Sequence, residues 1–450
     1  MTALLWDVQL EYLTEAEFTF EAWERSLDSP SFTLREVHEG PEARLRAYIR
    51  GLLVGGEPVL QRLVLPIFDA PDEDRFKTAA ATLAAASSPN LDARAHALET
   101  MARAGKEGLW GLVRGFQHTN RKGIGRLLAT GLAECEGSAL AGRLEALAPR
   151  GLDPKKRLVA WLGDGDPQVR RSAAMLARNT ASAAAMRALN ELVRDDSEPE
   201  VQLEAIETAL VRGLPGSWQV ASGLALGAKA GDAHRRRALA WLALQGDAEA
   251  HATLIAEVRK APDADGLWAV GLTGRPAAVE LAVELLDDPR LARVAGEVLA
   301  FVAGLPLDDK RWWLDDGARG LVGADPEEAL PPLAKDDLDA NLVPPVELEL
   351  HGPNPKIIRR WWSGQRERLE ADGRYLCGRP LDGRRLLWGL RELPTRRRHP
   401  LALELALRSH GTHGVDTRAA ARTQLATQAK LGPQREALAA IDCQSGLPLL

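Results

Sequence analysis

The sequence contains few cysteines, and none of them forms a metal-binding or disulfide pattern. Only three of its 450 residues are cysteine, at positions Cys135, Cys377 and Cys443, which are far apart in the chain. No CxxC pair occurs, so neither a structural zinc site nor a disulfide framework is indicated. So few cysteines fit a reducing compartment, and we expect a cytoplasmic protein without a metal or other cofactor.

Residues typical of β-strands and long apolar runs are also scarce. The chain has three Tyr and seven Phe, whereas Ala, Leu, Arg and Glu, which favour helices, are abundant. No apolar run approaches the roughly 18–20 residues that a membrane-spanning helix needs. The first residues include Asp7 and Glu11 and lack the basic and apolar segments of a signal peptide. We therefore predict an all-α protein that does not enter a membrane.

Signatures of catalysis are missing as well. The chain has no GxGxxG, HExxH or GxSxG motif, and Gly105-Lys106 lacks the remaining residues of a phosphate-binding loop. We expect no catalytic residue and no enzyme activity. Four isolated histidines on predicted helices are expected at the surface or partly buried: His96, His118, His234 and His251.

A short histidine-rich stretch, HGTHG at residues 410–414, is the nearest approach to a metal site. His410 and His413 could meet a metal together with Asp416. The flanking glycines instead favour an exposed turn between two helices. We therefore predict no metal site here.

The overall charge is small, because the formal net charge is -6 at pH 7. Such a balance gives no general reason to expect nucleic acid as the partner. With 45% hydrophobic and 27% charged residues, the composition is that of a globular chain.

A repeat of about 32 residues organises the centre of the chain. The string Asp166-Pro167-Gln168-Val169-Arg170 returns as Glu198-Pro199-Glu200-Val201-Gln202, more loosely from Asp232 and Pro262, and finally from Asp288-Pro289. The equivalent alanines Ala173, Ala205, Ala238 and Ala269 lie 32, 33 and 31 residues apart. Such a period is typical of stacked helix pairs.

Each copy carries a helix start followed by small residues. An acidic side chain before Pro can accept a hydrogen bond from a free N–H, and Pro at the first helical position loses none. The alanines let neighbouring helices approach closely, and one pair cannot cover its own apolar face. The pattern resembles short HEAT-type repeats, so we predict a HEAT-like α-solenoid.

Four segments follow from these patterns. We predict a helical N-terminal cap over residues 1–80, with a separate docking domain as the alternative. Thr14 to Glu17 and Thr33 to Glu36 are capping boxes in this segment. The repeat array covers residues 81–305, and a Pro-rich acidic linker covers residues 306–355. A C-terminal helical region covers residues 356–450, where Pro400 opens one helix and Asp416 caps the next.

The linker and the region after it have opposite charge. Residues 301–350 hold 12 acidic and 4 basic residues, whereas residues 351–400 hold 13 basic and 5 acidic ones. We expect the acidic segment to lie against the basic one or against the array. Residues 346–351 alternate in polarity, which predicts one short extended piece.

Several motifs resemble an uncharacterised bacterial family of HEAT-repeat proteins. They occur near both ends: Trp6-Asp7, Trp23-Glu24-Arg25, residues 48–56 (YIRGLLVGG), Arg360-Trp361-Trp362, residues 373–378 (GRYLCG), residues 401–407 and Asp416-Thr417-Arg418-Ala419. The resemblance implies the same fold along nearly the whole chain and an accessory or adaptor role in type VI secretion. It brings no catalytic residues, and the HGTHG stretch departs from it.

Two tryptophan pairs and two arginine groups are the candidate partner-binding residues. Adjacent helical residues point about 100° apart, so neither pair can bury fully on one face. The pairs either clasp the C-terminal region to the array or anchor a partner, because Trp beside Arg is typical of binding hot spots. The candidates are Trp312, Trp313, Arg359, Arg360, Trp361, Trp362, Arg396, Arg397 and Arg398.

The arginine runs have a simpler interpretation too. Arg396-Arg397-Arg398 is expected to be a solvated helix start, although it could hold an acidic partner or a phosphate. Arg235-Arg236-Arg237 is expected on an exposed helix.

The sequence favours a non-catalytic scaffold that binds another protein, as an adaptor or chaperone linked to secretion. Two alternatives stay open: an accessory subunit of an enzyme, as in lyase-like HEAT proteins, and a nucleic-acid binder acting through residues 351–400. The acidic net balance argues against the second of these.

Overall fold

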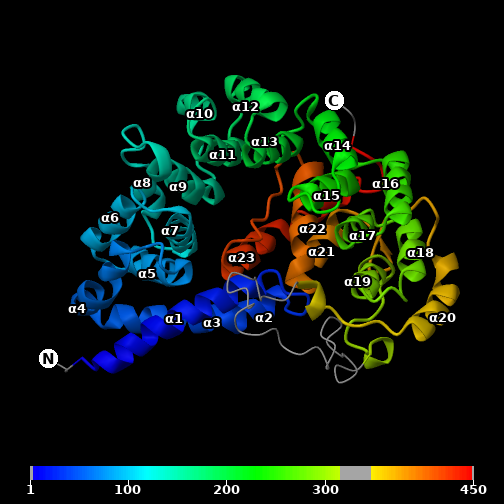
Figure 1. Cartoon of the computed structure of the whole chain (residues 1–450), viewed down its shortest axis with the longest axis horizontal. Coiled ribbons are helices and arrows are strands. Elements are labelled where there is room, and N and C mark those ends of the chain that lie inside the picture. Colours follow the sequence, from blue (N-terminus) through cyan, green and yellow to red (C-terminus); the bar gives the residue numbers. More distant parts are fainter. Residues whose placement is uncertain (1–3, 315–345, 448–450) are drawn as a thin grey trace, which may run out of the picture.

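The computed structural model describes residues 4–314 and 346–447, which are predominantly helical (Figure 1). Strands are limited to one short antiparallel hairpin within these residues, β1 (Tyr375–Leu376) and β2 (Arg379–Pro380). The all-α prediction is confirmed. No single helix in the described ranges has the length and apolar character to cross a membrane, and one bent pair, Leu34–Val54 with Gly56–Asp69, passes by length and composition only.

The N-terminal elements form the first part of the ribbon in Figure 1. They are α1 (Trp6–Ser26), α2 (Leu34–Glu39), α3 (Pro41–Val54), α4 (Gly56–Val59), the π-helix η1 (Leu60–Val64) and the 3-10 helix η2 (Leu65–Asp69), followed by α5 (Arg75–Ser87), α6 (Leu91–Thr100), α7 (Lys106–His118), α8 (Ile124–Ala129), α9 (Gly137–Leu147) and the 3-10 helices η3 (Ala148–Arg150) and η4 (Lys155–Arg157).

The central elements carry the repeat. They are α10 (Leu158–Leu162), α11 (Pro167–Leu176), the 3-10 helix η5 (Ala177–Asn179), α12 (Ala183–Asp195), α13 (Pro199–Val211), α14 (Ser217–Gly227), α15 (Arg235–Gln245), α16 (Ala248–Lys260), α17 (Ala264–Leu272), α18 (Pro276–Glu284) and α19 (Ala292–Ala303).

The C-terminal elements follow the array. They are η6 (Lys310–Trp312), η9 (Val346–Glu349), α20 (Pro355–Gln365), η10 (Arg366–Arg368), the hairpin, α21 (Gly383–Glu392), α22 (Thr395–Arg408), α23 (Ala421–Leu431) and α24 (Arg435–Ala439).

Most first helices of successive pairs pack on one another. Contacts join α9 to α11, α11 to α13, α15 to α17 and α17 to α19. The four equivalent alanines, Ala173, Ala205, Ala238 and Ala269, are fully buried on α11, α13, α15 and α17. Their complete burial agrees with the prediction that small residues stand where helices touch. Figure 1 shows the second helices, α12, α14, α16 and α18, toward the outside.

Local capping signals set some helix starts but not others. Asp166 and Asp263 accept hydrogen bonds from the backbone of Gln168 and Gly266 and begin α11 and α17, as predicted. Glu198 precedes α13 but makes no side-chain cap. Asp288 opens a turn instead, so α19 begins three residues after Pro289.

The two predicted N-terminal capping boxes have opposite outcomes. The box from Thr33 to Glu36 is present at the start of α2. The one at Thr14 is wrong, because α1 runs without a break from Trp6 to Ser26. No Gly or Pro interrupts residues 6–26, and buried side chains on both sides of Thr14, such as Leu13 and Phe20, hold one continuous helix.

The C-terminal helices α21, α22 and α23 lie on the inner side of the curved array, whereas α20 lies at its outer edge (Figure 1). Helix α22 contacts α13 and α15, β1 contacts α19, and α21 and α23 contact α2. The inner side formed by these first helices is therefore covered by the chain's own C-terminal region.

Contacts between the two ends of the chain complete this arrangement. The Thr395 hydroxyl donates to the carbonyl oxygens of Ser26 and Ser29, at 2.6 and 3.0 Å. Arg418 binds both carboxylate oxygens of Asp28 at 2.7 Å. These contacts join the start of α22 and the segment before α23 to the loop after α1.

Two predicted helix starts in this region are wrong. Pro400 lies inside α22, which begins at Thr395, where the N-terminal loop holds its first turn. Asp416 caps only a local turn, and α23 begins at Ala421. The free N–H groups of Ala421 and Arg422 donate instead to the buried carboxylate of Glu42, on α3.

The linker prediction is tested only at its ends. Residues 315–345, which carry most of its acidic groups, lie outside the described residues. Residues 346–349 form a 3-10 helix, so the predicted extended piece is wrong. Glu347 accepts from Arg396 at 2.8 Å and from Arg236 at 3.0 Å, which confirms complementary docking for this one acidic residue.

Candidate functional site

Three of the four candidate tryptophans meet at the end of the array. The rings of Trp312, on η6, and Trp361, on α20, lie 5.9 Å apart in an edge-to-face arrangement. The rings of Trp361 and Trp362 are 6.3 Å apart. A hydrogen bond of 2.9 Å from the backbone N–H of Asn354 to the Trp312 carbonyl fixes η6 beside the start of α20.

The pair on α20 divides into a buried and a half-buried residue, as helical geometry requires. Trp362 is 3% exposed, and its indole Nε1 donates to Glu280 Oε1 on α18 at 3.1 Å. Arg366 adds an ion pair to the same carboxylate at 2.9 Å. Trp362 therefore clasps α20 to the array, whereas Trp361 keeps part of its ring at the surface.

The outward face of α20 is basic. Arg359 pairs with Asp287 across to the turn after α18, and both side chains are exposed. Lys356, Arg360 and Arg368 are exposed and form no ion pair with a described residue. Ile357 is 39% exposed on the same helix. We call Lys356, Ile357, Arg359, Arg360 and Trp361 the α20 face.

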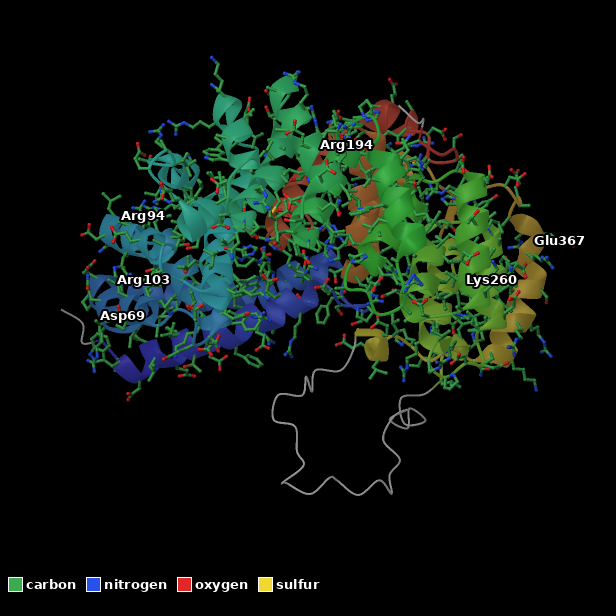
Figure 2. All side chains as sticks on the ribbon, turned by 45° about the horizontal axis from the view of Figure 1, so that its top comes forward. Asp69, Arg94, Arg103, Arg194, Lys260 and Glu367 are labelled. Carbon is green, nitrogen blue, oxygen red and sulfur yellow. The ribbon has the colours of Figure 1, made fainter. Side chains whose placement is uncertain are left out.

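The α20 face lies at the periphery of the molecule. Figure 1 shows α20 beside α18 at the outer edge, away from the covered inner side. Figure 2 shows the side chain of Glu367, on η10 just after this helix, on the same side as Lys260. Arg194 of α12 lies elsewhere on the surface (Figure 2).

Trp313 is separated from the other three tryptophans. Its ring lies 5.3 Å from that of His351, and its Nε1 donates to the Pro306 carbonyl at 3.0 Å. It forms one wall of a cavity of about 220 Å³ beside α19, which also meets Cys377 and the first turn of α22. Burial raises the pKa of the Cys377 thiol to about 11, so this group stays protonated at neutral pH.

The run Arg396-Arg397-Arg398 is buried, so the predicted solvated helix start is wrong. Arg396 pairs with Glu297 and Glu347, at 3.2 and 2.8 Å. Arg397 pairs with Glu297 at 2.8 Å and stacks on the Phe301 ring at 4.5 Å. Arg398 donates to the Leu390 carbonyl and to Gln424.

The run is buried because the first turn of α22 packs inside the molecule. There the carboxylates of Glu297 on α19 and Glu347 on η9 form ion pairs with its first two arginines. Burial lowers the pKa of Arg397 well below its ordinary range, and nearby Arg236 adds to this effect. Burial lowers the pKa of Arg398 to about 10. A role of these three arginines in partner binding stays a prediction, and their enclosure does not favour it.

The other arginine run is only half-exposed. Arg235 pairs with Asp263 at 2.6 Å, and Arg236 reaches Asp265 and Glu347. Arg237 pairs with Glu204 and Glu207 of α13, both at 2.9 Å. The expectation of an exposed helix is wrong here, because the run links successive pairs of the array.

Two of the four isolated histidines, His96 and His234, are partly buried as expected, and the other two are not. His118 and His251 are buried, contrary to expectation. The His118 ring packs edge-on against Trp23 at 4.2 Å. His251 Nε2 lies 2.9 Å from the Ala243 carbonyl, and its Nδ1 accepts from Arg275 Nε at 3.1 Å. The sequence could not predict these contacts, because neither histidine has a partner residue at a recognisable spacing.

The HGTHG stretch forms the predicted exposed turn, with φ of 49° at His410 and 77° at Gly411. In the described residues, no group of three or more His, Cys, Asp or Glu side chains could hold a metal ion.

Sequence reasoning missed a buried ionic centre that joins the hairpin to the array. Arg374 is fully buried, and its Nη1 binds Glu404 Oε1 of α22 at 2.6 Å. Its Nε donates to the Thr273 carbonyl at 2.7 Å. Arg408 approaches the same Glu404 oxygen at 2.8 Å and donates to the Leu244 carbonyl. The GRYLCG motif contains Arg374, but nothing in the sequence marked its partner.

Comparisons with known proteins add no relative. No protein-family model matches the chain, and no curated protein matches it significantly.

Proposed function

We propose that this protein is a non-catalytic scaffold that binds another protein, built as a HEAT-like solenoid with a helical N-terminal cap and a C-terminal helical extension. The repeat of about 32 residues and the succession of packed first helices support the solenoid. The resemblance at both chain ends favours an adaptor or chaperone role linked to bacterial type VI secretion.

The α20 face is the observation that carries the proposal. It combines a half-buried tryptophan, an exposed isoleucine, and two basic groups, Lys356 and Arg360, that form no ion pair with a described residue. Tryptophan and arginine dominate binding hot spots, because their large side chains exclude water from the contacts around them. The positive charge of Lys356 and Arg360 fits a partner with an acidic surface, which would also be attracted electrostatically.

Because the inner side of the array is covered, a partner is expected to bind at the periphery. In an open solenoid the concave surface is the usual binding surface. Here α22 packs against α13 and α15 and occupies that side. A partner that binds without displacing α22 therefore meets the outer surface, and α20 is the part of that surface with hot-spot composition.

Affinity capture tests the proposal. The tagged full-length chain is used as bait in the native host, and co-purifying proteins are identified by mass spectrometry. Arg360→Glu and Ile357→Ser should remove the partner while leaving the melting temperature unchanged, since both side chains are exposed. Arg194→Glu, on α12, is the matched control. Retention of every captured protein by both α20 variants would contradict the proposal.

The alternative of nucleic-acid binding is tested with the same variants. Part of the positive charge of residues 351–400 is internal, because Arg374, Arg396, Arg397 and Arg398 are buried. These groups cannot contact phosphates in this arrangement. Retention on DNA that falls with added salt and is lost in Arg360→Glu would favour that alternative. An enzyme as the captured partner would favour an accessory subunit.

A further inference from the structure

A second cavity, of about 360 Å³, lies between the array and the C-terminal region. The end of α7, the loop after it and η3 form its array wall, and α23 with the segment before it forms its C-terminal wall. Exposed residues such as Asn120 and Thr423 line this α7–α23 cavity, so it opens to solvent. Since an engineered cavity of about 150 Å³ holds benzene, there is room here for a molecule about twice as large.

The walls of the α7–α23 cavity are mainly polar. Nine of its twelve lining residues are polar: three threonines, three residues with side-chain amides, two arginines and one aspartate. Some of these groups are already satisfied, since the Gln424 amide donates to two backbone carbonyls and accepts from Arg398. The candidates for ligand contacts are therefore the lining groups that the described chain leaves without a partner.

The array wall carries positive charge that no carboxylate balances. Arg121 is exposed and Arg150 is half-buried, and neither forms an ion pair with a described residue. Arg150 donates only to backbone carbonyls, among them those of Ala146 and Phe116 near the ends of α9 and α7. Such carbonyls carry only a partial negative charge, so they do not cancel a full positive one.

Arg121 also has free donors. Its Nη1 donates to the Ser87 carbonyl at 3.2 Å, whereas its Nε and Nη2 have no partner in the described chain. Beside the cavity, Arg422 adds a third guanidinium group without an ion pair to a described residue. With the Asn120 side-chain oxygen turned toward it, Arg422 donates from Nε and Nη2, both at 2.8 Å. An anion is therefore the ligand group that fits the array wall.

The C-terminal wall offers acceptors instead. Asp416 Oδ1 accepts from the backbone N–H of Arg418 at 2.9 Å, and the other carboxylate oxygen has no partner in the described chain. The Thr423 hydroxyl also has none there. An ionised carboxylate only accepts, whereas a hydroxyl both donates and accepts. Ligand hydroxyl groups can satisfy both residues, and a second anionic group would be repelled by Asp416.

A phosphate ester fits the array wall better than a carboxylate does. A phosphate monoester carries a charge of about −1.5 to −2 at pH 7, which matches two guanidinium groups. Its oxygens can also accept parallel hydrogen bonds from two nitrogens of one arginine.

We propose that the α7–α23 cavity binds a small hydroxylated phosphate ester, such as a polyol or sugar phosphate. The phosphate accepts from the free nitrogens of Arg121, and Arg150 contributes positive charge. A ligand hydroxyl donates to Asp416, and another bonds to Thr423. The cavity shares no residue with the α20 face, and this inference does not depend on the proposed scaffold function.

Titration calorimetry with the full-length chain tests the proposal, using glycerol phosphate, glycerol and inorganic phosphate as probes. Glycerol phosphate should bind saturably and at least about tenfold more tightly than either of the others, because only it reaches both walls. No saturable binding of glycerol phosphate at millimolar concentration would overturn the proposal. Equal binding of glycerol phosphate and inorganic phosphate would also overturn it, since the hydroxyl groups would then contribute nothing.

A matched pair of variants locates the phosphate. Arg121→Gln should weaken glycerol phosphate binding about tenfold or more, because it removes a charged donor. Lys122→Gln removes the same charge from the next residue, which is exposed and does not line the cavity, and should change binding little. Equal losses in the two variants, or no loss in Arg121→Gln, would contradict the site.

A third variant tests the hydroxyl end. Asp416→Asn keeps the oxygen that accepts from Arg418 but removes the negative charge. The preference for glycerol phosphate over inorganic phosphate should fall about fivefold or more, since a charged acceptor is lost. The ratio of the two affinities is the measured quantity, because the loss of repulsion strengthens both ligands alike. An unchanged ratio would exclude Asp416 as the hydroxyl acceptor and overturn the proposed orientation.

Discussion

Arg374 Nη1 and Glu404 Oε1 are 2.6 Å apart in a part of the molecule without solvent exposure. Arg374 belongs to the loop before β1 and also binds carbonyl oxygens of α17 and the turn after it, whereas Glu404 belongs to α22. This pair thus fastens the C-terminal helices to the array, and Arg408 shares the same carboxylate oxygen at 2.8 Å.

Glu404→Gln should destabilise the fold strongly, by about 3–5 kcal/mol, because it leaves two buried guanidinium groups without their shared carboxylate. Urea unfolding followed by circular dichroism measures the change. Glu284→Gln, which breaks the exposed pair with Arg259, is the control and should change little. Equal effects of the two substitutions would argue against a special role for the buried centre.

Trp362→Ala should cost about 3–5 kcal/mol, since it removes a buried ring and its hydrogen bond to Glu280. Trp361→Ala should cost less, because part of that ring is already exposed. Thermal unfolding of the two variants measures the difference. If Trp361→Ala keeps its melting temperature but no longer captures the partner protein, the result supports the α20 face as the binding surface. If it keeps both, Trp361 does not belong to that surface.

Ala173→Leu should destabilise the array by about 1–3 kcal/mol, because the alanine is fully buried and a larger side chain overpacks its surroundings. Chemical unfolding measures the loss. Ala184→Leu, at an exposed position of α12, serves as the control. An unchanged unfolding curve for Ala173→Leu would mean that this contact can relax at no cost.

Acid should weaken the fold through His251. Burial, together with Arg374 and Arg275, lowers its pKa in the folded protein to about 2, against an ordinary value of 6.5. Below about pH 6.5 the His251 imidazole therefore binds a proton in the unfolded chain but stays neutral in the folded chain. The stabilisation from neutral His251 is fully present above that pH and is lost as the pH falls toward 2, by up to about 1.4 kcal/mol per pH unit.

Unfolding free energies measured between pH 7 and pH 4 test this dependence. In His251→Gln the slope should be smaller by about one proton, whereas His234→Gln, at the start of α15, should retain the original slope. His118 contributes in the same direction, since burial lowers its pKa as well. An unchanged slope in His251→Gln would show that His251 does not carry this linkage.

Glu42→Ala should loosen α23 without unfolding the array. The Glu42 carboxylate accepts from the first N–H groups of this helix, as an N-cap side chain would. Its loss should cost about 1 kcal/mol and speed amide hydrogen exchange in α23 roughly fivefold. Glu39→Ala, at an exposed neighbouring position, should leave exchange in α23 unchanged.

The sequence alone determined what depends on neighbours within one or two helical turns. Asp166 before Pro167 predicted the start of α11, and Thr33 with Glu36 predicted that of α2. The spacing of Ala173, Ala205, Ala238 and Ala269 predicted where helices pack closely. Helical geometry also predicted that Trp361 and Trp362 could not both be buried, although it could not say which one would be.

The tertiary structure decided where charges go, because their partners are distant in the chain. Sequence alone predicted that the basic run Arg396-Arg397-Arg398 is exposed to solvent. In the structure the first two arginines are buried and form ion pairs with carboxylates of α19 and η9. Glu42 caps a helix 379 residues away. A local pattern records the preference of a segment for helix or turn, whereas the burial of a charge depends on a counter-charge that only the folded chain brings within reach.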